Sequence, residues 1–344
     1  MGTLLLALVL LLATRDSNPE ISAFTAAEGS GPPVRGVSLS LYHPEDRARV
    51  PQALDGIVSL GANTVCLLYT LEQDGIHSDS VTRSDRPECS DSLILEVASQ
   101  ARIRGLKVVL FPLLHLRDTG PGKWRGSLRP RHWARWFQSY GNALSAAASV
   151  ADSARAQWFC VGAELVTTEG RGRDWRRLLR RIRSSCHGKL FYSQNWDHTR
   201  KLSFEAGLDA VGMNAYFELS PELRPSPARL RRAWARTRRK LEAAWPRPAP
   251  GRIFTEVGYP SVDGAAKSPW NYEQPGRANA KLQKDCLEAF FRAWAGSPAI
   301  HGAIIYLWSE QEDAAGTHYS IRAKPAEATV RKWFRAGFPQ GANP

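Results

Sequence analysis

Two glutamates occupy comparable positions, each at the end of a short apolar run with β-strand character. Glu164 ends the run that begins at Gln157, and Glu256 ends the run that begins at Arg252. A carboxylate is costly to bury beside apolar side chains unless it is paired or has a chemical task. Two such carboxylates in one chain are typical of sites that hydrolyse glycosidic bonds. The sequence therefore predicts paired-carboxylate chemistry, provided that the fold brings Glu164 and Glu256 together.

The elements that must position these glutamates alternate between strands and helices. Strands are expected at 34–41, 63–69, 106–113, 157–163, 189–194, 208–215, 252–257 and 302–308. Helices are expected between them, at 92–104, 133–151, 174–186, 227–245 and 279–295. Mostly apolar strands indicate a parallel sheet that is buried on both faces. Eight βα units without a glycine-rich phosphate turn after the first strand favour the α/β class and a single (β/α)8 TIM barrel over a doubly wound sheet.

In such a barrel the active site lies at the carboxyl ends of the strands. Glu164 ends the fourth strand and Glu256 the seventh, so the two carboxylates are expected to face each other across the barrel mouth. A separation of about 5–5.5 Å would suit hydrolysis with retention of configuration. Tyr216, on the sixth strand, is placed to donate a hydrogen bond to one of them. For each glutamate alone, the alternative is a structural ion pair at the rim.

The other strand ends are rich in aromatic and polar residues, which suggests a sugar-binding cleft. They are Tyr42, His43, Tyr69, His115, Asn195, Trp196, Tyr259 and Trp308. Glu169 is expected either to bind substrate or to cap a helix. The acidic segment Glu310, Glu312 and Asp313 is expected to be a solvated loop rather than a site for an ion or sugar. For His115, as for His198 and Asp197, loop hydrogen bonding is the alternative to a place in the cleft.

The charge and the motif content of the chain indicate which binding partners to expect. The net charge of +13 comes mainly from arginines in two amphipathic segments, 173–183 and 229–240, which are expected to be solvated outer helix faces. No nucleic-acid-binding motif accompanies them, so no nucleic-acid partner is expected. The chain also lacks metal-ligand spacing, a Gly-x-Ser-x-Gly elbow and a dinucleotide fingerprint. We therefore expect no metal and no cofactor, and for any one of the 12 tryptophans packing is favoured over a role as a sugar platform.

The N-terminal region resembles an export signal. Residues 3–13 are apolar but too short to span a bilayer comfortably, and 25–27 form a small-residue cleavage site. We expect a signal-like segment and flexible lead-in over 1–33, a barrel domain over 34–338, and a secreted or periplasmic (cell-envelope) location. An uncleaved membrane anchor is the alternative. Of the five cysteines, Cys66 and Cys160 are expected to be buried small apolar residues.

Several stretches, in order along the chain, resemble the retaining glycoside hydrolases of clan A, and most closely glycoside hydrolase family 113. They are Trp124-Arg125-Gly126, 136–140, 161–165, 192–197, 209–216, 255–261 and 269–272, with Lys324-Pro325-Ala326 near the end. The resemblance implies that Glu164 is the general acid/base and Glu256 the nucleophile, oriented by Tyr216. It implies a polysaccharide substrate, and the family is associated with β-1,4-mannan.

The resemblance also implies sugar contacts. Asn195, Trp196, Trp270 and Trp308 would line the subsites, with Trp308 as the platform beneath the ring at the scissile bond, and Trp124, Tyr69, His115 and Tyr259 are expected to join them. Two departures concern the sugar. Ala163 stands where most clan A barrels have asparagine, and residues 110–113 read Leu-Phe-Pro-Leu where Lys-Pro-His is expected. The prediction is a retaining β-glycosidase with mannan as nominal substrate; the alternative is an inactive carbohydrate-binding barrel.

Overall fold

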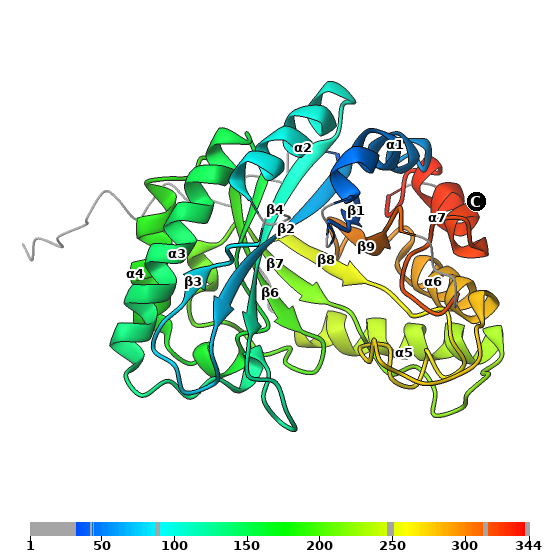
Figure 1. Ribbon diagram of the computed structural model, residues 1–344. Coiled ribbons are helices and arrows are strands. Elements are labelled where there is room, and N and C mark those ends of the chain that lie inside the picture. Colours follow the sequence, from blue (N-terminus) through cyan, green and yellow to red (C-terminus); the bar gives the residue numbers. More distant parts are fainter. Residues whose placement is uncertain are drawn as a thin grey trace, which may run out of the picture. The chain divides into compact units, whose positions relative to one another are not determined.

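The computed structural model describes residues 32–41, 43, 45–86, 90–245, 251–311 and 316–340 (Figure 1). The expectations for the signal-like segment and most of the lead-in fall outside these residues. So do those for Tyr42, Glu312 and Asp313.

Eight parallel strands form a closed ring, which confirms the predicted (β/α)8 TIM barrel. They are β1 (Val34–Leu39), β2 (Thr64–Gln73), β4 (Lys107–Leu116), β5 (Trp158–Ala163), β6 (Lys189–Asn195), β7 (Ala210–Asn214), β8 (Gly251–Val257) and β9 (Gly302–Trp308). Each strand pairs with the next around the ring, and β9 pairs with β1 to close it. Glu164 therefore follows the fourth barrel strand and Glu256 lies on the seventh, as expected.

Helices surround this ring on the outside (Figure 1). They are α1 (Asp46–Ser59), α2 (Asp91–Ile103), α3 (Trp133–Ser153), α4 (Gly172–Arg183), α5 (Pro227–Ala244), α6 (Ala280–Trp294) and α7 (Pro325–Arg335), with short 3-10 helices η2 (Arg125–Ser127), η3 (Val166–Thr168) and η4 (Glu205–Gly207). The helices expected from the sequence are all present, with ends moved by only a few residues. Among the described helices, none is both long and apolar enough to cross a bilayer.

The core has two apolar layers, one inside the barrel and one between the strands and the helices. The inner layer includes Cys66, Phe111, Cys160 and Phe191, so the two strand cysteines are buried as predicted. The outer layer holds most of the tryptophans that are fully buried: Trp136, Trp175, Trp234, Trp294 and Trp333. Since side chains on successive strand residues point to opposite faces, membership of one layer or the other reports which way a strand residue points.

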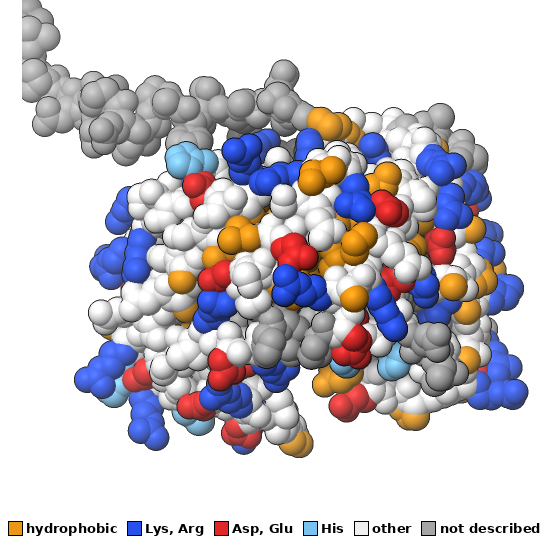
Figure 2. Space-filling view, turned by 45° about the horizontal axis from the view of Figure 1, so that its top comes forward, with side chains coloured by type: hydrophobic (Ala, Val, Ile, Leu, Met, Phe, Trp, Pro, Cys, Tyr) orange, Lys and Arg blue, Asp and Glu red, His pale blue; other side chains and the backbone are white. Residues whose placement is uncertain are grey.

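The arginine-rich helices α4 and α5 turn their apolar faces inwards. In α4 the buried residues are Trp175, Leu178, Leu179 and Ile182, together with Gly172, and the arginines lie on the opposite face. Figure 2 shows that Lys and Arg side chains are spread over the face in view and are interspersed with Asp and Glu. The expectation of solvated outer faces is confirmed for these helices.

One side of the barrel mouth stands higher than the rest. Strands β2 and β4 have 10 residues each and pair from Thr64–Lys107 to Gln73–Leu116. Their neighbours β1 and β5 pair only with the earlier part of this ladder, so the later part continues past the ring. The two-residue strand β3 (Thr82–Arg83) returns antiparallel to the end of β2. We call residues 70–86 and 113–117 the raised wall.

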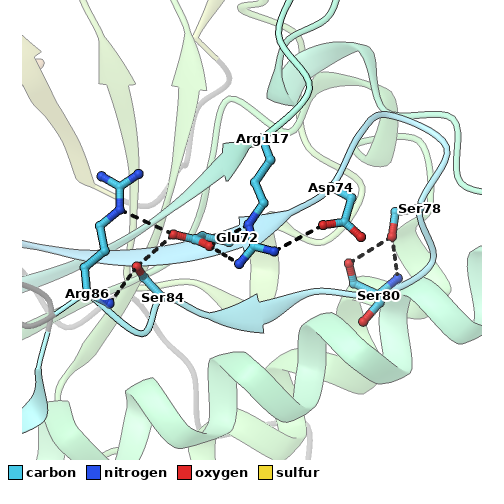
Figure 3. Close-up of polar contacts among 7 residues, drawn as sticks. All are labelled: Glu72, Asp74, Ser78, Ser80, Ser84, Arg86 and Arg117. Atoms are coloured by element: carbon cyan, nitrogen blue, oxygen red, sulfur yellow. Dashed lines mark hydrogen bonds and ion pairs between the residues drawn. The ribbon is translucent and has the colours of Figure 1, made fainter.

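A buried carboxylate ties the raised wall together. Glu72 of β2 accepts hydrogen bonds from Ser84 Oγ (2.8 Å) and Arg117 Nε (2.9 Å), and Arg86 lies on the other side of the carboxylate (Figure 3). Burial alone raises the pKa of Glu72, but these hydrogen bonds and the charge of Arg117 outweigh it and hold the pKa below its usual range. The wall is thus fixed by ionic contacts that need an ionised Glu72.

Candidate active site

Glu164 is turned into the barrel mouth by irregular backbone. The β5–β6 ladder shifts register between Cys160 and Ala163, and Glu164 has a φ of 57°, in the left-handed region. That conformation costs a non-glycine residue about 1–2 kcal/mol and persists only where the surroundings hold it. Here the backbone N–H of Glu164 donates to the carbonyl of Ser193 at 2.8 Å. The side chain is buried, and the strain marks Glu164 as a functional candidate.

A β-bulge turns the side chain of Glu256 into the barrel mouth. Alternation from Ile253, which points into the barrel, would send Glu256 outwards towards the helices. Instead, the ladders of β8 with β7 and with β9 both shift register beside Thr255, and Glu256 pairs with Asn214. The extra residue brings Glu256 to the inner side while Val257 packs in the outer layer. Bulges of this kind are frequent next to active sites because they re-aim a side chain.

The carboxylate of Glu164 is held by a guanidinium. Arg125 Nη1 donates to Glu164 Oε2 at 2.8 Å, and Arg125 Nε donates to the carbonyl of Leu114 at 2.8 Å. Arg125 belongs to η2, and Leu114 belongs to the part of β4 that builds the raised wall. The wall therefore supplies the anchor that fixes Arg125 against Glu164.

Glu256 is held by a neutral hydroxyl. Tyr216 donates from its OH to Glu256 Oε2 at 2.7 Å, and the rings of Tyr306 and Tyr319 lie edge-on to the ring of Tyr216 at 6.4 and 6.3 Å. Burial, and next the charge of Glu164, raise the pKa of Glu256 to about 7, against the opposing effects of Tyr216 and Arg125. The charge of Glu164 thus reaches Glu256 across the barrel mouth.

Hydroxyl and amide groups brace the strands that carry Glu256. Asn214 Oδ1 accepts from Ser193 Oγ at 2.8 Å and from Thr255 Oγ1 at 3.0 Å. The three residues come from β6, β7 and β8 and are fully or almost fully buried. This network keeps the bulge beside Glu256 in a single geometry.

Several other predicted site residues lie near this pair or on open surface. Asn195 is buried and donates from Nδ2 to Asp197 at 2.7 Å, and Trp196 packs beside the Tyr216 and Tyr319 rings. On the raised wall, partial withdrawal from solvent and then the charges of Arg125 and Arg86 lower the pKa of His115 to about 4. His115 is consequently a neutral imidazole at neutral pH. Trp124 and Trp270 are exposed, at 38% and 49%, as a binding platform requires.

Three predicted sugar contacts point the other way, into the layer beneath the helices. Tyr69 is buried and donates its OH to Asp91 of α2, and the OH of Tyr259 accepts from Trp234 Nε1 of α5. Trp308 packs against Gly56 of α1. The structure does not bring Tyr69, Tyr259 or Trp308 to the mouth, which corrects the expectation that they contact a sugar.

The aromatic ring that β9 turns towards the mouth is that of Tyr306. Ile304 and Tyr306 point inwards by simple alternation, and the same rule would send Trp308 inwards. The β1–β9 ladder shifts register between the Val37–Ile305 and Leu39–Trp308 pairs, so Trp308 lands on the helix side. Tyr306 packs against Tyr216 and Tyr319 instead. The sequence at the end of β9 predicts an aromatic side chain at the mouth, but it does not distinguish Tyr306 from Trp308.

Two acidic residues outside the pair have structural partners. Glu310 is buried, accepts from Trp308 Nε1 at 2.8 Å and pairs with Arg322 at 2.9 Å, so the expectation that it lies in a solvated loop is wrong. Glu169 accepts from the OH of Tyr192 at 3.0 Å, and burial raises its pKa to about 7. No side-chain hydrogen bond caps α4, so a helix-capping role for Glu169 is not supported. Within the described ranges, no three His, Cys, Asp or Glu side chains gather as a metal site.

A (β/α)8 barrel that carries two interacting carboxylates at its mouth, each with a fixed hydrogen-bond donor, defines the class of the glycoside hydrolases. The model of Glycoside Hydrolase Family 113 matches residues 44–324. The chain belongs to this family and is a glycoside hydrolase, as the ordered motifs predicted.

Solved structures agree with this assignment. A GH113 β-mannanase, AaManA from Alicyclobacillus acidocaldarius in complex with ManMIm, is 26% identical, with a TM-score of 0.76 over 89% of this chain and 98% of that one. A GH113 β-1,4-mannanase complex shares the fold at 22% identity and a TM-score of 0.77, over 89% and 100%. More distantly, a GH5_18 protein from Streptomyces cattleya in complex with GlcNAc shares the fold at 15% identity and a TM-score of 0.58, over 91% and 82%. No curated protein matched the chain.

Proposed function

We propose that the protein hydrolyses a β-linked polysaccharide, with mannan as the nominal substrate, by double displacement with retention of configuration. The observation that carries the proposal is the placement of two buried carboxylates at the barrel mouth, with Arg125 bound to Glu164 at 2.8 Å and Tyr216 bound to Glu256 at 2.7 Å. Glu256 attacks the anomeric carbon while the departing oxygen takes a proton from Glu164. Water, deprotonated by Glu164, then cleaves the glycosyl ester on Glu256.

The surroundings of each carboxyl support these roles. A nucleophile benefits from a fixed direction and little water, and Glu256 lies among Tyr216, Tyr306 and Tyr319 with one oxygen held by a hydroxyl. An acid/base must be ionised at one stage and protonated at another. Glu164 sits beside a permanent positive charge on Arg125, which stabilises its ionised stage.

Sugar contacts are proposed for the residues that the mouth offers. Trp196 and Tyr306 pack against the cluster that contains Tyr216, Asn195 ends β6, His115 lies on the raised wall, and Trp124 and Trp270 are exposed. Mannan is supported by the GH113 structures with the same fold, which are β-mannanases. The third barrel strand offers no polar sugar contact at two positions, because Phe111 is buried inside the barrel and Leu113 is apolar and half-buried. At this strand, His115 is the polar group available to a hydroxyl.

The test compares wild type, Glu164→Ala and Glu256→Ala on mannan, glucomannan, cellulose, xylan and chitin fragments. We expect reducing ends from wild type, the β anomer as the first product by NMR, and large losses in both variants. Added azide should give an α-glycosyl azide with Glu256→Ala and a β-glycosyl azide with Glu164→Ala, since the azide takes the place of the missing carboxylate in one case and of water in the other.

Glu96→Ala, on the outer helix α2 and ion-paired with Arg47, is the matched control and should keep full activity. Release of the α anomer would overturn retention. Glycan binding without turnover by any of the proteins would instead favour an inactive carbohydrate-binding barrel.

We further propose that the protein is exported to the cell envelope or beyond, since a polysaccharide cannot enter the cytoplasm intact. The apolar segment 3–13 supports this. Fractionation of producing cells, with mass spectrometry of the N-terminus, tests it. An unprocessed N-terminus in the membrane fraction would indicate an anchor, and an unprocessed cytosolic protein would contradict export.

A further inference from the structure

Arg125 is fixed more firmly than a charge that merely lines a cleft. Its guanidinium is held at two points, by the Leu114 carbonyl and by Glu164 Oε2, each at 2.8 Å, and its side chain is about three-quarters buried. A guanidinium has five N–H donors in a rigid plane, so two contacts fix its orientation. Arg125 therefore binds one carboxylate of the pair directly and acts on the other, Glu256, only through its charge.

Several titratable groups around the pair are neutral near pH 7. Burial raises the pKa of Tyr216 and Tyr319 far above neutrality, and it does the same for the thiols of Cys66 and Cys160 inside the barrel. His115 on the raised wall has a pKa of about 4 and is uncharged as well. Arg125, in contrast to these groups, carries a charge at neutral pH.

We propose that Arg125 is a positioning residue that decides which carboxyl holds the proton that the pair shares. In the free enzyme the ion pair keeps Glu164 ionised, so the proton resides on Glu256. When a glycosidic oxygen approaches Glu164 and loosens its bond to Arg125, the proton passes from the Glu256 carboxyl to the Glu164 carboxylate. The total charge is unchanged, and the transfer creates both the ionised nucleophile and the protonated acid.

This inference rests on the proposed function and predicts a distinct pH signature. A fixed positive charge lowers the proton affinity of both carboxyls, and its effect on Glu256 has this sign. Arg125→Gln should therefore move both limbs of the kcat/KM profile to higher pH, by about one unit or more for a charge at this distance. Arg125→Lys keeps the charge and should leave the limbs near their wild-type positions, with a lower kcat.

A matched control exists on the outer surface. Arg238 of α5 also binds one carboxylate and one carbonyl, donating from Nε to Glu242 at 2.8 Å and from Nη1 to the Ala293 carbonyl at 2.7 Å. Arg238→Gln loses the same kinds of contact away from the mouth and should leave the pH profile unchanged. Thermal unfolding of each variant shows whether it is folded under assay conditions.

A second measurement does not need turnover. Difference infrared spectra follow the protonated-carboxyl band through a pH titration of wild type, Arg125→Gln and Glu256→Gln. We expect the band to persist to higher pH in Arg125→Gln than in wild type, and to be reduced in Glu256→Gln near pH 6. Failure on every glycan would remove the proposed function but leave this titration readable. An unchanged profile and band in folded Arg125→Gln, or an equal shift in Arg125→Lys, would overturn the role of Arg125.

Discussion

The two sides of the barrel mouth differ in the charge of the groups that surround a carboxylate. On the side of the raised wall, Glu164 and Glu72 each face a guanidinium, that of Arg125 or Arg117. On the opposite side, Glu256 has only the neutral hydroxyl of Tyr216 and a surround of rings. The same residue type is thus stabilised as an ion on one side and driven towards its neutral form on the other.

This resting arrangement is the reverse of what bond cleavage requires, since the acid must be protonated and the nucleophile ionised, so the proposed proton transfer from Glu256 to Glu164 has to precede it. Burial raises the pKa of Glu256, whose hydrogen-bond partner is neutral, whereas hydrogen bonds and ionic partners hold the pKa of Glu72 low. The charge of the partner and the greater depth of Glu256 in the barrel mouth together separate the two cases. Changes to the partners should therefore move the properties of each side separately.

The largest effect is expected from the carboxylates themselves. Glu256→Gln should lower kcat by about 10⁴-fold or more on every substrate, because no ester can form. Glu164→Gln should cost about 10²–10⁴-fold on a polysaccharide. On an aryl glycoside with an activated leaving group, Glu164→Gln should lose far less in the first step. Steady-state and burst kinetics on both substrate types check this, and equal losses on both would contradict the division of roles.

Removal of the Tyr216 hydroxyl should have the next largest effect. Tyr216→Phe deletes one hydrogen bond to an ionised carboxylate, worth about 1.5–3 kcal/mol, so kcat should fall roughly 10- to 100-fold. Because this bond lowers the pKa of Glu256, its loss raises that pKa further. Since Glu256 holds the shared proton in the free enzyme, the alkaline limb of kcat/KM, which reports loss of that proton, should move to higher pH.

Tyr319→Phe is the control for this change. It also removes a buried hydroxyl near the pair, but that hydroxyl donates to the Pro269 carbonyl rather than to Glu256. Its effect on the alkaline limb should be much smaller. Identical profiles for Tyr216→Phe and wild type would show that the hydroxyl does not set the charge of Glu256.

A smaller effect distinguishes the two aromatic residues at the end of β9. Tyr306→Ala should raise KM roughly tenfold with little change in thermal stability, because an aromatic face contributes about 0.5–1.5 kcal/mol beyond its buried area. Trp308→Phe should do the reverse: it leaves KM unchanged and costs about 1–3 kcal/mol of stability, through lost packing on α1 and the lost bond to Glu310. A KM effect confined to Trp308→Phe would restore Trp308 as the platform.

This pair of residues also shows where prediction from sequence stops. The spacing of apolar residues and the glycines between helices and strands were enough to predict the eight strands. The order of the strands alone then put Glu164 opposite Glu256. The facing of residues at the strand ends was not predictable, because register shifts in β5, β8 and β9 interrupt the alternation there. A strand-end residue could thus be identified by position but not assigned to a side.

The contact between Arg125 and Glu164 could not be predicted from the sequence, for a different reason. The two residues are 39 positions apart, and their meeting depends on the height of the raised wall. That height comes from the pairing of β2 and β4 beyond the ring, and no sequence pattern within either strand predicts this pairing. Trp124-Arg125-Gly126 was recognised as a motif, but the partner of its arginine is a property of the assembled mouth.

The smallest effect concerns the stability of the raised wall. Because the pKa of Glu72 is lowered in the folded protein, its ionisation contributes stability that is present above the unfolded-state pKa, about 4.3, and is lost as pH falls through the folded value. Glu72→Gln should be less stable than wild type at pH 7, by less than about 1 kcal/mol since Arg117 faces solvent. The difference should shrink progressively below about pH 4. Urea unfolding at several pH values measures it, and Arg117→Gln should change in the same direction. A difference that stays constant with pH would mean that the ionic contacts around Glu72 do not hold the wall.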